Sequence, residues 1–220
     1  MNLPKIPLVV FIGLIASALH FPQISITNAP PEASQPIHCR VTWTSDPATS
    51  ATISWSTTSA TSTSFVRYRV KESREQAASI IPESGRFTGG QTELHYHHAR
   101  LTQLRPSTAY EFQVSCDGQL SDKLYFVTAP VEDRPMSILQ GGDSRSDHKT
   151  RRQVNQMMST LVSESFANNE LADDIIAFAH GGDYVANGAN LEQWFKWLSD
   201  QQLTTCEDGR VLPVIPARGN

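Results

Sequence analysis

The spacing of apolar residues changes once, a little past the middle of the chain, and this change constrains the fold more than any other feature. Before it, apolar and polar residues alternate: in "FVRYRV", Val66 and Val70 share one face while Arg67 and Arg69 share the other. Short alternating segments separated by Ser-, Thr-, Pro- and Gly-rich clusters are typical of antiparallel sandwiches. We therefore expect an all-β sandwich over residues 33–130.

Residues 135–220 instead alternate apolar runs with segments of helical spacing. The runs are "MSILQGG", "IIAFAH" and "VLPVIP". The expected helical stripes are Val154, Met157, Met158, Leu161 and Ser165, with Arg151, Arg152 and Glu164 outside, and then Leu191, Trp194, Phe195 and Leu198. Asn190 and Gln193 are spaced to form a capping box at the start of the second helix. The strand–helix–strand–helix–strand order predicts a parallel sheet with right-handed crossovers.

Each of the three apolar runs leads to a glycine followed by a residue with a side-chain oxygen, namely Asp143, Asp183 or Asn220. Because all strands of a parallel sheet finish at one edge, these residues should converge although about 40 positions separate one from the next. The glycines let the backbone turn sharply and approach a ligand closely. Two carboxylates and an amide oxygen suit a hard or borderline divalent cation. The pattern predicts a metal site at this edge.

These Gly-Asp, Gly-Asp and Gly-Asn pairs resemble, in order, strand context and spacing, the motifs of the calcineurin-like metallophosphoesterases. The segment "LTQLRPSTAYEFQV" resembles the fibronectin type III pattern around its tyrosine corner. Leu104, Pro106, Thr108 and Tyr110 occupy the matching positions. An exported fibronectin-like module before such a catalytic domain is similar to the purple acid phosphatases. The resemblance implies a fibronectin type III-like domain over residues 33–130, followed by the N-terminal half of an α/β metallophosphoesterase domain over residues 135–220.

The resemblance also implies a function. The implied function is that of a metal-dependent phosphoric ester hydrolase with a dinuclear centre of Fe, Zn or Mn. The enzyme would be an acid phosphatase-like phosphomonoesterase or a phosphodiesterase. In that centre Asp143 binds one metal, Asp183 bridges both and Asn220 binds the second. Two ions ~3.5–4 Å apart can hold a phosphate ester and lower the pKa of a bound water. Arg145 suits phosphate as a contact, and a structural salt bridge is its alternative role.

Three features depart from the purple acid phosphatase pattern. Many relatives have a His two residues after the first Asp, where this chain has Arg145. The iron-binding Tyr three residues after the bridging Asp is replaced by Ala186, and the adjacent Tyr184 is expected to point elsewhere, so the resemblance does not extend to a ferric–tyrosinate. The family also has a His directly after the position of Asn220 and later His-bearing blocks; His148 and His180 fall at other positions. We therefore expect these 220 residues to be truncated and inactive alone, with "VLPVIP" as an unpaired strand edge.

Two other functions remain open on sequence grounds. "GGDSRSD" also resembles the Gly-Asp-Ser block of exported esterases with a Ser nucleophile, a role that would fall to Ser144. Such an enzyme needs an oxyanion-hole Asn block and a late Asp-x-x-His, and neither is visible in the sequence. The second alternative is a non-catalytic secreted binding module with a vestigial α/β part. The intact Asp143, Asp183 and Asn220 argue against it.

The N-terminus has the order of a secretory signal peptide. Lys5 is followed by "IPLVVFIGLIASAL", which is uncharged and ends in an Ala-Ser-Ala site, so we expect cleavage after Ala18 and a secreted or periplasmic protein. This run is shorter than the ~20 residues that span a bilayer, so no stable membrane insertion is expected. The formal net charge of −4, without a dense Lys/Arg patch, argues against a nucleic-acid partner. The substrate that the resemblance implies is a phosphate ester.

Cysteines and histidines provide two further candidates. Cys39 and Cys116 would both face inward, so a disulfide and a pair of buried thiols are both open in an oxidising compartment, and Cys206 is left without a partner. His95 and His97 would share a strand face, which makes a metal site conceivable. An exposed strand with polar residues is the interpretation that we favour for this segment.

Overall fold

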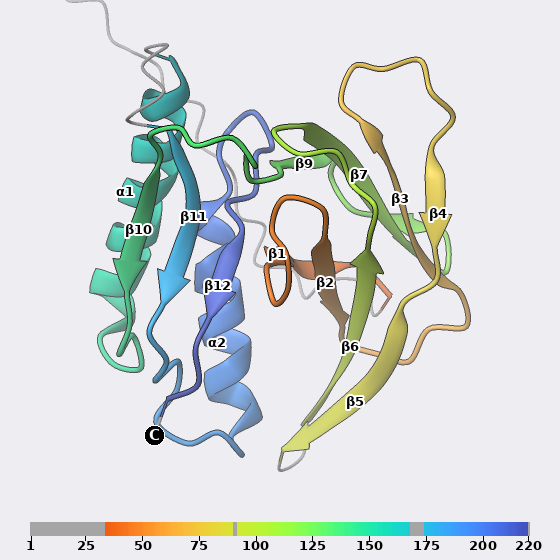
Figure 1. Cartoon of the computed structure of the whole chain (residues 1–220). Helices are drawn as coiled ribbons and strands as arrows, with labels where there is room; N and C mark the ends of the chain where they lie inside the picture. The colour runs from red at the N-terminus through yellow and green to blue at the C-terminus, as the bar shows by residue number, and fades with distance from the viewer. Residues whose placement is uncertain (1–33, 90–91, 168–173, 220) are drawn as a thin grey trace, which may run out of the picture. The chain divides into compact units, whose positions relative to one another are not determined.

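The computed structural model describes residues 34–89, 92–167 and 174–219 (Figure 1). Contacts divide the chain into residues 1–30 and a compact unit of residues 31–220. The expected signal peptide lies outside the described residues. Within the described part, no helix is both long and apolar enough to cross a membrane.

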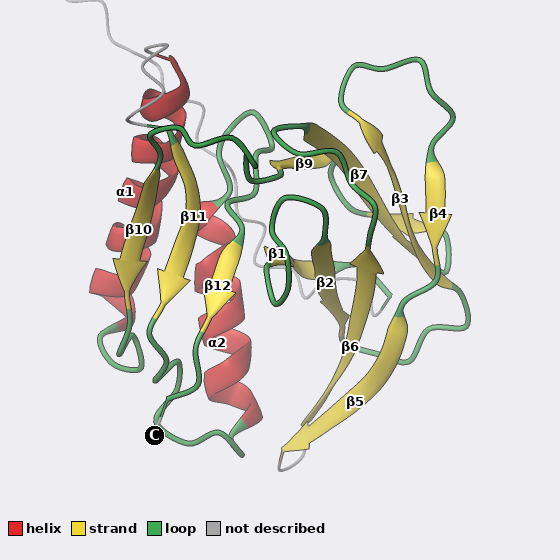
Figure 2. Cartoon of the chain, in the orientation of Figure 1, coloured by secondary structure: helices red, strands yellow, loops and turns green. Residues whose placement is uncertain are grey.

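The elements change in kind along the chain, as Figure 2 shows by colour. In the described residues their order is β1 (Ile37–Thr42), β2 (Ala51–Thr57), β3 (Ser64–Val70), β4 (Ala78–Ile80), β5 (Glu83–Gly89), β6 (Thr92–Leu101), β7 (Ala109–Cys116), β8 (Gln119–Leu120), β9 (Leu124–Val127), β10 (Ser137–Gly141), α1 (His148–Ala167), β11 (Ile175–His180), α2 (Leu191–Gln201), a 3-10 turn (Gln202–Thr204) and β12 (Val214–Pro216). Among the residues that the structure describes, helices occur only after β10, so the change of hydrophobic period coincides with the change from strands alone to alternating strands and helices.

Strands β1 to β9 form the two sheets of a sandwich. β1, β2, β6 and β5 pair in one sheet, and β4, β3, β7 and β8 in the other, with β9 also on β7. The core between them contains fully buried Trp55, Val66 and Phe126. Along β3 the alternation is as predicted, because Val66 is buried while Arg67 is exposed. The all-β sandwich is therefore confirmed.

The tyrosine corner that the sequence predicts is present before β7. The backbone N–H of Arg105 donates to the Tyr110 hydroxyl at 2.8 Å. The Tyr110 ring packs against Phe126, with ring centroids 6.0 Å apart, and nearby Leu104 is buried in the same core. The corner ties the loop before β7 to the strand and so fixes where the sandwich chain turns.

Strands β10, β11 and β12 pair in parallel in the order in which they occur, as the alternating pattern predicts. α1 and α2 connect them and pack against each other; α2 also packs on the sandwich strands β5 and β6. Because parallel strands finish at the same edge, the loops after β10, β11 and β12 emerge together (Figure 1).

Strand β12 is not an edge strand, so the expectation of an unpaired edge at "VLPVIP" is wrong. It pairs in parallel with β1 through Thr42 and Val214, and the N–H of Trp43 donates to the Val214 carbonyl at 2.9 Å. A seven-stranded sheet therefore runs β10–β11–β12–β1–β2–β6–β5. Ile176 and Val211 join the sandwich core as a result, and the edge at this end of the sheet is β10.

The predicted inner face of α1 is confirmed for Met158 and Ser165, which are buried, and wrong for its other three residues. Val154, Met157 and Leu161 are 46%, 62% and 41% exposed. The buried residues of α1 are Arg151, Asn155, Met158, Val162 and Ser165. The cause is polar: Arg151 and Asn155 both donate hydrogen bonds to Asp200 of α2, and this contact turns their side of the helix inward.

Helix α2 follows its predicted stripe more closely. Leu191 and Leu198 are buried against the outer face of the sandwich sheet that contains β6. At the N-terminus the Asn190 side chain accepts from the Gln193 N–H at 3.1 Å, as a capping box requires. The return bond differs, because the Gln193 side chain accepts from the N–H of Asn187, three residues further back, at 2.9 Å.

The cysteines in the described residues are free thiols. Cys116 is fully buried and accepts a hydrogen bond from the Trp55 indole at 3.1 Å, and Cys39 packs against the same core. Burial raises the pKa of Cys39 to about 12. The inward placement of both residues is confirmed. Of the two alternatives, the structure has the pair of thiols rather than the disulfide.

Candidate metal centre

Asp143 and Asp183 lie just beyond the carboxyl ends of two neighbouring strands, β10 and β11. Gly141 and His180 are register partners at the last pair of the ladder, and the Asp143 N–H then donates to the Gly182 carbonyl at 2.9 Å. Both aspartates have left-handed backbone, with φ of 47° and 57°. Asp tolerates this region better than most residues, and strained backbone of this kind is concentrated at functional sites.

Glycines bring the loop after β12 against Asp183. Gly182 has φ of 98°, and a Cβ atom there would lie 2.5 Å from the backbone nitrogen of Gly219. A Cβ atom on Gly219 would in turn collide with the Asp183 carboxylate. The residue before Asn220 therefore contacts Asp183 through backbone that only glycine permits. Asn220 itself lies outside the described residues.

Arg145 connects the two carboxylates. Its Nε lies 2.9 Å from Asp143 Oδ1, and its Nη1 lies 3.2 Å from Asp183 Oδ2. The side chain of Asp143 is 69% exposed, whereas that of Asp183 is 18% exposed. The two acidic groups, 40 positions apart in sequence, thus face one cationic group at the sheet edge. Of the two roles weighed for Arg145, the salt bridge is the one present here.

In the described residues, no histidine gathers with other ligand-type side chains (His, Cys, Asp or Glu) into a group of three that could hold a metal ion. His148 lies 3.6 Å from Asp200 rather than beside Asp183. On the sandwich, His97 accepts or donates hydrogen bonds with Ser84 and stacks on a tryptophan, and burial, then His95 and His98, lowers its pKa to about 4.

Ser144 and His180 form a contact that the sequence did not predict, with Ser144 Oγ 2.9 Å from His180 Nε2. The Gly182 N–H donates to His180 Nδ1 at 3.1 Å, so in the neutral ring the proton resides on Nε2 and is donated to Ser144. Burial lowers the pKa of His180, which favours the neutral ring. The Trp197 indole also donates to Ser144 Oγ, at 2.8 Å. Ser144 thus accepts two hydrogen bonds, and His180 Nε2 has no lone pair to deprotonate it.

Tyr184 points away from the carboxylates, as expected. Its hydroxyl donates to the Ala217 carbonyl at 2.9 Å, and its ring stacks on His180 with centroids 4.1 Å apart. Burial raises the pKa of the Tyr184 phenol. A neutral phenol bonded to the backbone is not placed to ligate a cation between Asp143 and Asp183.

A buried network that the sequence analysis missed supports the loop after β10. Arg151 donates to Asp200 Oδ2 through Nε at 2.9 Å and through Nη2 at 2.6 Å. Its Nη1 donates to the carbonyl of Ser144 at 2.6 Å. The guanidinium therefore ties α2 to the residue after Asp143. Helical spacing placed Arg151 on the outer face, and no local signal indicated its acidic partner 49 positions away.

A cavity of ≈ 350 Å³ adjoins this edge. Asp143 and Ser144 line one side of it, and Met158, Phe178 and Trp197 supply apolar surface. The cavity therefore has both polar and apolar lining and lies next to the Asp143 carboxylate. Such a cavity can hold the organic part of a small ester while its polar group lies at the sheet edge.

Comparison with known proteins gives a family for the first part of the chain. Residues 36–128 match the family model for the N-terminal domain of purple acid phosphatase. This range coincides with the sandwich strands, which begin at β1 and end at β9. A search of curated proteins finds no match.

Solved structures extend the likeness beyond the sandwich. The chain is similar to purple acid phosphatase PPD1 from yellow lupin (Lupinus luteus) seeds, at 16% identity and a TM-score of 0.63, over 85% of this chain and 35% of that chain. It therefore spans about a third of that protein's length. PhoD also matches, at 13% identity and a TM-score of 0.47, over 87% of this chain and 40% of that chain. At these identities the likeness concerns the fold. The family match therefore concerns residues 36–128, which are similar to the N-terminal domain of purple acid phosphatase, and the likeness of the rest of the chain is one of fold.

Proposed function

We propose that this chain contributes to a metal-dependent phosphoric ester hydrolase, with Asp143, Asp183 and Asn220 as metal ligands. The observation that carries the proposal is the meeting of two carboxylates around one cation: Arg145 makes ion pairs of 2.9 and 3.2 Å with Asp143 and Asp183. Neither carboxylate is local to the other in sequence. A fold that brings two acidic groups together at its ligand-binding edge is suited to a cation there.

The donor set fits a metal. Carboxylate oxygens suit Mn, Zn and Fe, and the less exposed Asp183 lies between Asp143 and the loop that leads to Asn220. Asp183 is therefore the residue proposed to bridge two ions, with Asp143 on one and Asn220 on the other. Two such ions would clamp a phosphoryl group and supply an activated water for in-line attack.

Arg145 has a second role in this proposal. Its guanidinium is long, exposed and already at the edge, so it can turn from the carboxylates to the oxygens of a phosphate ester. Ser144, His180 and Trp197 do not take part in bond making; they hold the loop that carries Asp143 and Arg145. The cavity beside Asp143 would receive the organic part of the ester.

The rival function, a serine esterase with Ser144 as nucleophile, finds less support. The nucleophile of such an enzyme donates its proton to a neighbouring base. Here His180 is the donor to Ser144, since its Nδ1 accepts from the Gly182 N–H. If the ring proton of His180 moved to Nδ1, the buried N–H of Gly182 would face a second N–H instead of an acceptor.

The test is metal binding with a matched control. Mn²⁺ binding to the chain would be followed by loss of the free-ion EPR signal, with Asp183→Asn compared with Asp133→Asn, an exposed aspartate before β10. We expect Asp183→Asn to weaken binding at least tenfold and Asp133→Asn to leave it unchanged. Equal losses in both variants, or no Mn²⁺ binding to the unsubstituted chain, would contradict the proposal. So would hydrolysis of p-nitrophenyl phosphate that persists after the metal is removed with EDTA.

Export belongs to the same proposal. The uncharged run after Lys5 and the Ala-Ser-Ala site support cleavage after Ala18. A secreted or periplasmic phosphatase would meet phosphate esters outside the cytoplasm.

A further inference from the structure

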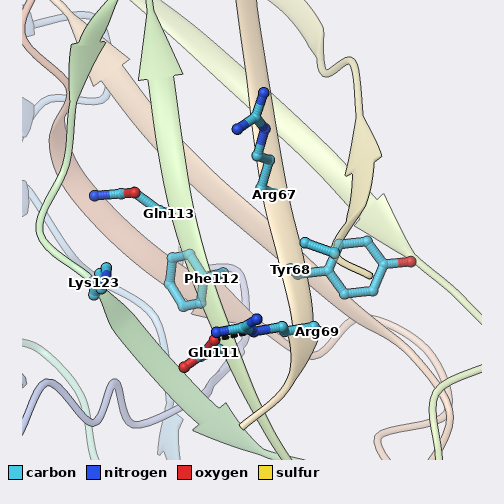
Figure 3. Close-up of a pocket in the computed structure, with 8 residues that line it drawn as sticks. Arg67, Tyr68, Arg69, Glu111, Phe112, Gln113 and Lys123 are labelled. Atoms are coloured by element: carbon cyan, nitrogen blue, oxygen red, sulfur yellow. Dashed lines mark hydrogen bonds and ion pairs between the residues drawn. The ribbon is translucent and has the colours of Figure 1, made fainter. Parts of the chain in front are cut away.

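The outer face of the sheet formed by β3, β7 and β9 carries a shallow groove of ≈ 160 Å³. Arg67 and Arg69 line it from β3, Glu111 and Gln113 from β7, and Lys123 from the residue before β9 (Figure 3). Three of these five side chains are cationic in a chain whose formal net charge is −4. The groove is thus a local excess of positive charge on an otherwise acidic protein.

The strand register brings three of these residues into one row. Arg67 is the direct cross-strand partner of Gln113, and on the other side of β7 Leu124 pairs with Phe112, which places Lys123 beside Gln113. Neighbouring strands lie ~4.8 Å apart, so Arg67 and Lys123 flank Gln113 at one strand spacing each. Their long side chains can therefore reach the same ligand above the Gln113 amide.

The charges in this row are not neutralised by the protein. Arg69 is paired with Glu111, as the dashed line in Figure 3 marks. Arg67 and Lys123 are exposed, and neither makes an ion pair with any residue in the described ranges. The Arg67 guanidinium carbon lies 5.2 Å from the centroid of the Phe65 ring. Two unpaired cations one strand to either side of Gln113 are suited to one oxyanion group.

Gln113 adds a different preference. Its amide nitrogen donates to the Ser121 carbonyl at 2.8 Å, which orients the amide and leaves its oxygen as an acceptor in the row. An acceptor between two cations repels a bare oxyanion but accepts a hydrogen bond from a hydroxyl. A ligand that satisfies all three residues therefore carries both an oxyanion and a hydroxyl group a few ångströms apart.

We propose that this groove binds an acidic saccharide, with a sulfate or carboxylate group held by Arg67 and Lys123 and a neighbouring sugar hydroxyl donated to Gln113. The groove is open, so successive units of a longer chain can pass over it, and Arg69, which is paired with Glu111, lies two residues further along β3. The proposal does not depend on the metal centre.

The experiment is calorimetric titration of the full chain with a sulfated heparin tetrasaccharide. We expect Arg67→Ala and Lys123→Ala each to weaken binding about tenfold, the size of one charge-assisted hydrogen bond. Gln113→Leu, which removes the acceptor without changing charge, should weaken it severalfold. Arg86→Ala is the control, because it removes an exposed cation from β5 in the other sheet, 3.8 Å from Glu93, and should have little effect. Urea midpoints of all variants would verify that they fold.

Four results with charged ligands would overturn the inference. They are the absence of tetrasaccharide binding, an equal loss in Arg86→Ala, equally tight binding of inorganic sulfate, and equally tight binding of an oligodeoxynucleotide of the same charge. The first result would show that the groove is not a binding site, and the second that binding reflects the overall charge of the protein. The last two would show that the groove does not recognise a saccharide. A neutral maltotetraose should not bind, and binding as tight as that of the sulfated sugar would also contradict the role of the cations.

Discussion

The buried ion pair between α1 and α2 makes a sharp prediction about stability. The side chains of Arg151 and Asp200 are 6% and 7% exposed, and Arg151 donates two hydrogen bonds to Asp200 Oδ2. Asp200→Ala would leave the Arg151 guanidinium buried without its carboxylate. Removing one partner of such a pair costs about 3–5 kcal/mol, because the remaining charge is uncompensated. For a chain of this size the melting temperature should fall by about 2–4 °C per kcal/mol, so by about 6–20 °C.

The assay is urea and thermal unfolding, followed by circular dichroism. The matched control is Glu192→Ala on the same helix, which breaks the i,i+4 pair with Lys196; those side chains are 75% and 53% exposed, so loss of the pair should change stability little. The double variant Arg151→Met with Asp200→Leu removes both charges and should recover most of the loss. Equal losses in Asp200→Ala and Glu192→Ala, or a double variant no more stable than Asp200→Ala, would refute the reasoning.

Four further predictions follow from individual contacts. Arg145→Ala removes the cation that faces both carboxylates, so Mn²⁺ affinity measured by EPR should rise about tenfold while metal-dependent phosphate binding falls. Gly182→Ala should destabilise the chain in urea by at least about 1–3 kcal/mol, because φ is 98° and a Cβ would meet backbone; an unchanged midpoint would contradict this. Burial, then Arg40, lowers the pKa of His38 to about 3, so its contribution to stability is complete above about pH 6.5 and is lost as pH falls towards 3. Between pH 7 and pH 5 the free energy of unfolding of the unsubstituted chain should therefore fall by about 2 kcal/mol more than that of the His38→Gln variant. Secreted protein should begin at Leu19 by N-terminal sequencing, and an uncleaved start at Met1 would contradict export.

The sandwich could be predicted because its signals are local. Alternation along β3 sets which side chains face the core, since successive residues of a strand point to opposite faces. The tyrosine corner is likewise contained in a short segment, with Arg105 and Tyr110 five positions apart. Such features survive in the sequence because each is defined by neighbours along the chain.

The candidate site was predicted in part for the same reason. Asp143 and Asp183 follow apolar runs, and the rule that parallel strands end at one edge placed them together before any contact was known. The role of Arg145 stayed open, because a guanidinium near two strand ends can face an acid or a ligand. The Ser144–His180 contact was missed, since it joins the loop after β10 to the last residue of β11, and their separation depends on the register of the two strands.

Tertiary structure decided what periodicity could not. α1 has apolar residues on more than one side, and the buried bonds from Arg151 to Asp200 selected the side that faces inward and left Met157 exposed. β12 pairs on its second side with β1, more than 170 positions earlier, because unpaired backbone N–H and C=O groups of a buried strand are costly. The sequence by itself determined the kind of each element and the residues at the strand ends, since both follow from local spacing. The choice of partners, faces and charge neighbours needed the folded chain, because those contacts join residues that have no relation along the sequence.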